Sequence, residues 1–190
     1  TAAFAKIKSY EAEGRIFIHP FDDPLVMAGQ GTLGLEIMED LPGATDIIIS
    51  IGGGGFCGGV STAVKALKPG IRIWGVETMG ADCMSLAINA GHPVELAAIT
   101  SIAKTLGAPS VSARTLALAQ EHLEEVLVVP DKEAVKALKF ILERLKVLTE
   151  PAASCTLAAA LRLRDQFSNN NNLVLIFCGG NLPVFSVGTP

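Results

Sequence analysis

The chain has 190 residues, enough for one domain of moderate size or most of a slightly larger one. About half of the residues are hydrophobic, only 18% are charged and 19 are glycine, a mixture typical of α/β proteins with buried parallel strands. A net charge of −4 gives no electrostatic reason to expect nucleic acid or an anionic membrane as partner, and no apolar run reaches the roughly 18 residues of a membrane span. The polar N-terminus lacks the pattern of a signal peptide, so we expect a cytoplasmic protein.

The first part of the chain predicts two helices and a strand. Gly14 and Pro20 delimit a short apolar run, RIFIH, that reads as the strand. The expected elements are a helix over 3–12, a strand over 15–19, a turn over 21–24 and a helix over 30–40.

A βαβ unit follows and provides the strongest fold signal. Residues 46–51 (DIIISI) form a continuous β-branched run, typical of a strand buried on both faces. A helix over 57–67 and a second strand over 71–76 come next. A strand, a helix and a strand within some thirty residues predict a parallel sheet.

The rest of the chain also combines predicted helices with predicted strands. Residues 92–112 have little periodicity and contain two prolines, so we expect a long functional loop there. The other expected elements are helices over 82–90, 113–122, 131–145 (capped by Asp131) and 152–164, and strands over 126–129 and 173–177. The sequence therefore predicts an α/β fold of three layers, with a mostly parallel sheet and helices on both faces.

Cysteines and histidines do not suggest a metal site. The four cysteines are far apart and show no metal-ligand spacing, so we interpret them as thiols: Cys57, Cys83, Cys155 and Cys178. The three histidines share no motif and are interpreted as surface or core residues rather than catalysts: His19, His92 and His122.

Four consecutive glycines, Gly52–Gly55, separate the buried strand from the next helix. Glycines permit positive φ and leave no Cβ in the way of a ligand, and the first N–H groups of a helix have no partner within it. The helix dipole favours an anion at the same place, so the segment predicts an anion site, most naturally for a phosphate. The alternative is a tight turn that needs small residues only for close packing.

Two nucleotide-binding patterns fit this loop less well. No lysine follows as a GxxxxGK[ST] motif requires. The spacing GxGxxG can be placed on Gly53, Gly55 and Gly58, with Glu77 as the later acid, but that match is only suggestive. The phosphate need not belong to a nucleotide.

Several motifs together carry a family resemblance. In order along the chain they are HPFDDP (19–24), GQGT (29–32), GGGG (52–55), ITSIAKTLG (99–107), EPA (150–152) and CGGN (178–181). The glycine run after a buried strand resembles the phosphate loop of the tryptophan-synthase-like (fold type II) pyridoxal-phosphate enzymes. The whole series is similar to the serine/threonine dehydratases among them.

The resemblance implies a reaction and a domain layout. The activity would be pyridoxal-phosphate-dependent β-elimination of L-serine or L-threonine to a 2-oxo acid and ammonia, carried out by a longer chain that forms a homodimer. Residues 1–14 would end a small domain, and 15–190 would belong to the large cofactor-binding domain, a partial tryptophan synthase β-like fold. Other members of the family, such as a serine racemase, remain an alternative.

The resemblance also assigns cofactor contacts. The N–H groups of Gly52–Gly55 would bind the phosphate, Cys178 would contact the pyridine nitrogen, and Glu150 would face the ring. A neutral thiol leaves the ring a weaker electron sink than a carboxylate would, which suits β-elimination. The alternatives are a buried structural cysteine at 178 and a solvated glutamate before Pro151 at 150.

A cation site is a further implication. By the resemblance, its ligands would be the Glu77 carboxylate and carbonyl oxygens of three other residues: Ala81, Leu106 and Ala108. Such a site suits a monovalent ion like potassium. Cys83 stands where several relatives have an aspartate, which puts a divalent ion in doubt. The alternative is that Glu77 is an ordinary surface carboxylate at a strand end.

One family motif is missing from the sequence. The lysine that forms the internal Schiff base lies in a Ser–x–Lys–x–Arg-like segment in this family, and no such segment occurs in the 190 residues. We therefore expect a C-terminal piece of a longer chain that is inactive by itself. The competing interpretation is a non-catalytic module that binds phosphate ligands.

Overall fold

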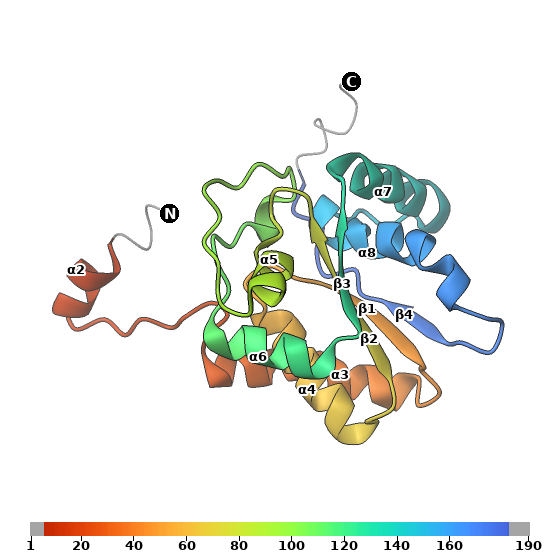
Figure 1. Cartoon of the computed structure of the whole chain (residues 1–190), viewed down its shortest axis with the longest axis horizontal. Coiled ribbons are helices and arrows are strands. Elements are labelled where there is room, and N and C mark those ends of the chain that lie inside the picture. The colour runs from red at the N-terminus through yellow and green to blue at the C-terminus, as the bar shows by residue number, and fades with distance from the viewer. Residues whose placement is uncertain (1–5, 183–190) are drawn as a thin grey trace.

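The computed structural model describes residues 6–182 and contains one parallel β-sheet. Its four strands have the order β3-β2-β1-β4 (Figure 1). They are β1 (Asp46–Ser50), β2 (Arg72–Thr78), β3 (Glu125–Val129) and β4 (Leu173–Leu175). The predicted α/β class and the parallel sheet are confirmed.

Helices lie on both faces of this sheet, while α2 (Ile7–Ala12) stands apart from it (Figure 1). The other helices are α3 (Pro24–Asp40), α4 (Gly55–Leu67), α5 (Cys83–Ala90), α6 (Ala113–His122), α7 (Asp131–Leu145) and α8 (Pro151–Arg162), with short 3-10 turns η1 (Lys104–Leu106) and η2 (Arg164–Gln166). Within residues 6–182, no helix is long and apolar enough to cross a membrane.

Alternating side chains of the central strand pack on the two helical layers. Ile47 and Ile49 belong to one buried cluster with Val60 and Val64 of α4. Ile48 belongs to a second cluster that includes the alanines of α8. Because successive side chains of a strand point to opposite faces, one apolar run supplies both halves of the core.

The strand predicted over 15–19 is wrong: this segment has no strand structure. Ile16 is 89% exposed and Ile18 is 64% exposed, and no neighbouring strand pairs with them among the described residues. Figure 1 shows the segment as an extended connection to α2, which stands apart from the sheet. Of the helix predicted over 3–12, residues 3–5 lie outside the described residues.

Other boundaries differ for local reasons. The second helix begins at Pro24 rather than at residue 30, because the Asp23 side chain caps it by accepting hydrogen bonds from the N–H groups of Leu25 and Val26. Asp131 is the first residue of α7 and not its cap. The last strand, β4, is shorter than predicted and only partly buried, because it lies at the edge of the sheet.

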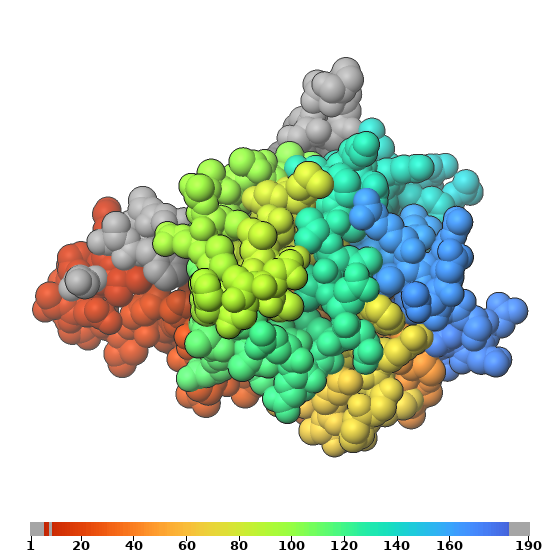
Figure 2. Space-filling model, viewed as in Figure 1, coloured from red at the N-terminus to blue at the C-terminus, as the bar shows by residue number. Residues whose placement is uncertain are grey.

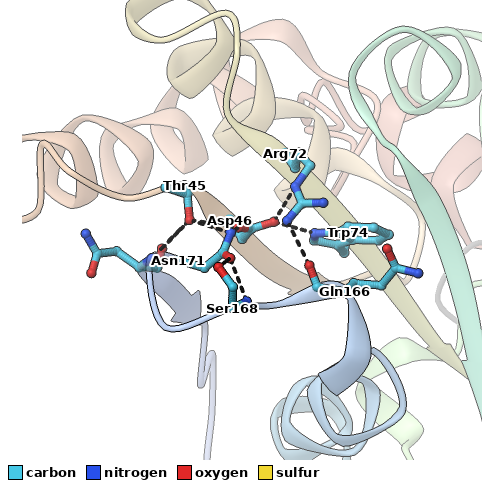
Figure 3. Close-up of polar contacts among 8 residues, drawn as sticks. Thr45, Asp46, Arg72, Trp74, Gln166, Ser168 and Asn171 are labelled. Atoms are coloured by element: carbon cyan, nitrogen blue, oxygen red, sulfur yellow. Dashed lines mark hydrogen bonds and ion pairs between the residues drawn. The ribbon is translucent and has the colours of Figure 1, made fainter.

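A buried carboxylate joins the starts of three strands (Figure 3). Asp46, with no exposed surface, opens β1. It is ion-paired with Arg72 of β2 at 2.8 Å and accepts hydrogen bonds from Trp74 Nε1 at 3.0 Å and Asn171 Nδ2 at 2.8 Å. Thr45 Oγ1 donates a further bond at 2.7 Å. A buried charge is tolerated only when it is paired in this way, so the cluster fixes the register of β1, β2 and β4.

We expect Asp46→Asn to lower the free energy of unfolding by about 2–4 kcal/mol, because it leaves buried donors and Arg72 without their charged partner. The measurement is urea unfolding at pH 7. Asp40→Asn, at the exposed end of α3, is the control and should change the value by less than about 0.5 kcal/mol. Equal effects of the two changes would contradict the role of the cluster.

The same cluster predicts a pH dependence. Burial alone would raise the pKa of Asp46, but hydrogen bonds from Trp74, Thr45, Arg72 and Asn171 outweigh it and hold the pKa below its usual value. The stabilisation is therefore complete above the unfolded pKa of about 3.9 and is lost as the pH falls through the lower folded value. The difference between wild type and Asp46→Asn should shrink below about pH 4.

Candidate active site

A cavity of about 830 Å³ lies where the strands end. Parallel strands bring their carboxyl ends to one edge of the sheet, where ligands of α/β proteins usually bind. The cavity is lined by the glycine loop and by residues from other segments, among them His19–Phe21, Ser50, Thr105–Ser112, Glu150 and Cys178. Its size is in the range of small-molecule sites.

The glycine loop leads from β1 into α4 with its backbone at the cavity. Gly54 has φ = +92°, a left-handed conformation that side chains disfavour. The N–H of Gly58 bonds to the carbonyl of Gly54 at 2.8 Å, so the N–H groups before it are not used within the helix. They and the positive end of the α4 dipole form a site for an anion.

Three of the four glycines also satisfy a packing requirement. A Cβ at Gly53 would overlap the ring of Phe21, and a Cβ at Gly55 would overlap the Phe21 backbone. A Cβ at Gly54 would lie 2.8 Å from both Met84 Cε and Thr115 Cβ. The tight-turn alternative therefore accounts for Gly53, Gly54 and Gly55. The argument for an anion depends on the helix start that the loop leaves open to the cavity.

Cys178 follows β4 and lies beside Ser50 at the end of β1. The thiol and the Ser50 hydroxyl are 3.4 Å apart. Cys178 is exposed toward the cavity, so the alternative of a buried structural cysteine does not hold. The desolvating surroundings raise the pKa of its thiol despite the Ser50 hydrogen bond, and nearby Glu150 acts in the same direction. Cys178 is therefore a neutral group at neutral pH.

Glu150 precedes α8 and is only 8% exposed. It lines the same cavity as Cys178 and the glycine loop, which is not the solvated position of the alternative. Burial raises the pKa of the Glu150 carboxyl, and the Thr105 hydroxyl, which donates to it, lowers the pKa in part. A Cβ at Gly179 would lie 2.5 Å from Glu150 Oε1, so a larger residue there would displace the Glu150 carboxyl from its position.

Glu77, near the end of β2, is completely buried and is not a surface carboxylate. Its oxygens accept hydrogen bonds from the N–H groups of Met84 at 2.9 Å and Ser85 at 2.8 Å, at the start of α5. Burial raises the pKa of Glu77 to about 8, although these two bonds act against it. Burial thus disfavours the charged form of Glu77, and a cation bound beside it would stabilise that form, which makes Glu77 a candidate cation ligand.

The other residues of the predicted cation site lie in the same region. Ala81 and Leu106 belong to one buried cluster, and Ala108 lines the cavity next to Leu106. Their carbonyl oxygens as ligands remain a prediction. Among residues 6–182, no group of three or more histidine, cysteine or acidic side chains could hold a metal ion.

Some cavity residues were not identified from the sequence. His19 lines the cavity, and its Nδ1 accepts hydrogen bonds from the N–H groups of Phe21 at 3.3 Å and Asp22 at 2.9 Å. Ser50 is the last residue of a strand, and the meeting of the strands' carboxyl ends was the signal that could have identified it. Thr105 lies in the family motif 99–107 but was not singled out within it.

Comparison with known proteins gives a consistent result. Residues 1–179 match the family described as "Pyridoxal-phosphate dependent enzyme". An L-threonine ammonia-lyase from Geobacter sulfurreducens is 36% identical over 183 residues, which are 96% of this chain and 45% of that protein. The chain thus spans about half the length of this relative.

Solved structures share the fold. Maize serine racemase superimposes with a TM-score of 0.89 at 34% identity, covering 97% of this chain and 59% of that one. Threonine deaminase isoform 2 from Solanum lycopersicum also has a TM-score of 0.89, at 32% identity, covering 95% of this chain and 50% of that one.

The packing of Phe21 on Gly53 can be tested by a double-mutant cycle. Gly53→Ala should lower the free energy of unfolding by about 1–3 kcal/mol, because the new methyl group overlaps the Phe21 ring. In a Phe21→Ala background the same change should cost at least about 1 kcal/mol less. Both are measured by urea unfolding, and additive effects would contradict the contact.

Proposed function

Because the chain belongs to the pyridoxal-phosphate-dependent enzyme family, we propose that its cavity holds pyridoxal phosphate in an ammonia-lyase that acts on L-threonine or L-serine. The observation that carries the proposal is the meeting of the α4 start, Cys178 and Glu150 in one cavity. Residues 15–190 would form the large cofactor-binding domain and residues 1–14 the end of a small domain.

The residues present fit this cofactor. The phosphate would bind at Gly52–Gly55, where the N–H groups before Gly58 and the α4 dipole favour a doubly charged anion. The remaining cavity wall is mostly apolar, with Phe21, Leu106 and Ala152 among its members, which suits an aromatic ring.

Bound pyridoxal phosphate supplies an electron sink for the bonds at the substrate Cα. Cys178 would lie at the ring nitrogen as a neutral partner, consistent with the raised pKa of its thiol. The Ser50 hydroxyl, 3.4 Å away, orients that thiol. A neutral contact limits the strength of the sink and so favours loss of the β-hydroxyl over competing reactions.

Glu150 would contribute a carboxyl group near Cys178, and the Thr105 hydroxyl donates to it. Burial raises the pKa of this carboxyl, which favours a role in holding or moving a proton. Within residues 6–182, no lysine lines the cavity. The proposed reaction therefore needs its reactive amine from outside these residues, and dimerisation is likewise part of the proposal for the whole protein.

A second candidate is amino-acid racemisation, which the similarity to maize serine racemase favours. Both reactions begin with loss of the Cα proton and use the same cavity. They differ in the product, which is a 2-oxo acid and ammonia in one case and the D-amino acid in the other.

The product therefore tests the proposal. We expect the gene product that contains this chain to form a 2-oxo acid from L-threonine or L-serine faster than it forms D-serine.

Cys178→Ala should lower kcat by at least about tenfold because the ring nitrogen loses its partner, whereas Cys178→Ser should retain most activity because a hydroxyl can replace the thiol. D-serine as the main product would favour the racemase, and an unchanged kcat in Cys178→Ala would remove Cys178 from the site.

We also propose a potassium ion at Glu77 with carbonyl oxygens of Ala81, Leu106 and Ala108. A cation would stabilise the charged form of Glu77, which burial disfavours and the N–H groups of Met84 and Ser85 support only in part. At ten times its Kd, potassium should stabilise the fold by about 1.4 kcal/mol and raise Tm by about 3–5 °C.

Thermal unfolding in KCl and in tetramethylammonium chloride of equal ionic strength measures this effect. Glu77→Gln should abolish the difference between the two salts because it removes the charged ligand. The same Tm in both salts for the wild type would contradict the cation site.

A further inference from the structure

Residues 99–108 have no regular structure apart from the turn η1, and the last four of them, 105–108, line the cavity. Thr105 donates to Glu150, and the Leu106 backbone lies against Gly52, where a Cβ would be 3.4 Å from Leu106 Cα. The shape of the cavity therefore depends on how this segment is held. In Figure 2, the yellow-green part of the chain that includes this segment lies at the surface, beside the green-to-teal part.

A buried polar cluster holds the start of the segment. Ser101 has no exposed surface. Its hydroxyl donates to Asp131 Oδ1 at 2.6 Å. It also accepts from the N–H of Ala103 at 3.0 Å and pairs with the hydroxyl of Thr78, the buried last residue of β2, at 2.8 Å. With its donor and acceptor positions used, Ser101 is locked in one orientation.

Asp131 connects this cluster to the sheet. It opens α7 and is separated from the end of β3 only by Pro130, the cap of the helix. Its second oxygen, Oδ2, accepts from the N–H of Ile102 at 3.0 Å. The carboxylate thus makes hydrogen bonds to two consecutive residues of the segment rather than to the N–H groups of its own helix. Bonds to a charged acceptor are stronger than those between neutral groups.

We propose that Asp131 is a positioning residue of the cofactor site. Through Ser101 and Ile102 it holds residues 99–108 where Thr105 and Leu106 complete the cavity. Buried Ala103 anchors the middle of the segment independently, so loss of the carboxylate loosens the segment without unfolding the protein. The role toward the cofactor rests on the proposed function, but the mechanical role does not.

Hydrogen–deuterium exchange of the cofactor-free protein tests the mechanical role. Asp131→Ala and Ser101→Ala should speed exchange in residues 99–108 by about tenfold or more, the equivalent of one charge-assisted hydrogen bond. Exchange in β1 should stay at the wild-type rate. Asp131→Asn keeps one acceptor and should give an intermediate rate. Unchanged exchange in the segment, or an equal rise throughout the protein, would overturn the proposal.

Glu133→Gln is the matched control for Asp131→Asn. Both changes remove one negative charge from the first turn of α7, so their effects on the helix dipole are alike. Glu133, however, is paired with Arg162 of α8 at 2.7 Å and makes its contact away from the segment. Glu133→Gln should leave exchange in residues 99–108 unchanged, and a rise equal to that of Asp131→Asn would overturn the role of Asp131.

Equilibrium dialysis with pyridoxal phosphate tests the role of Asp131 toward the cofactor. Asp131→Ala should raise the Kd about tenfold, whereas Glu133→Gln should not change it. If the wild type binds and Asp131→Ala binds equally well, the positioning role toward the cofactor is overturned. If the wild type does not bind pyridoxal phosphate, the proposed function fails, while the exchange rates still decide whether Asp131 holds the segment.

Discussion

The parallel pairing of β1 with β2 and β4 is the constraint on which the rest of the molecule depends. Asp46 pairs with Arg72 on one side and is level with Leu173 on the other, so the three strands start together. The buried Asp46 carboxylate makes this start specific, because a shift of register would leave it without its donors. Since the strands start together and run in the same direction, their carboxyl ends lie at one edge of the sheet, and residues at or after these ends line one cavity.

The cavity shows how packing and binding can require the same residue type. Gly53 and Gly55 are small because Phe21 lies against them, and Gly54 is glycine because its φ is +92°. The same absence of side chains leaves the start of α4 open to a ligand. Packing and phosphate binding are thus compatible explanations of one glycine run, and mutations there affect stability and binding together. Cys178 and Glu150 differ in this respect, because each brings a polar side chain to the cavity, held by a hydroxyl group of the fold: Ser50 for Cys178 and Thr105 for Glu150.

The opposite wall depends on polar contacts rather than on regular structure. A segment of this length would be poorly defined if only its own backbone bonds held it. Ser101, Thr78 and Asp131 replace a missing helix or strand with a buried network, and apolar Ala103 and Leu106 complete the attachment. Such a network is rigid while every member is satisfied and is sensitive to the loss of any one of them.

The sequence by itself determined the α/β class, the parallel sheet, most helices and the glycine loop, because each follows from local periodicity or from the backbone freedom of glycine. The family motifs located Glu150 and Cys178 as candidates. Only the tertiary structure decided that residues 15–19 form no strand, that β4 is a partly buried edge, and that Asp131 bonds to the loop instead of capping α7. Asn171, in a short polar run without any pattern, contributes to the Asp46 cluster 125 residues away. Such contacts join residues that are distant in sequence, and neither periodicity nor spacing encodes which polar groups will be buried together.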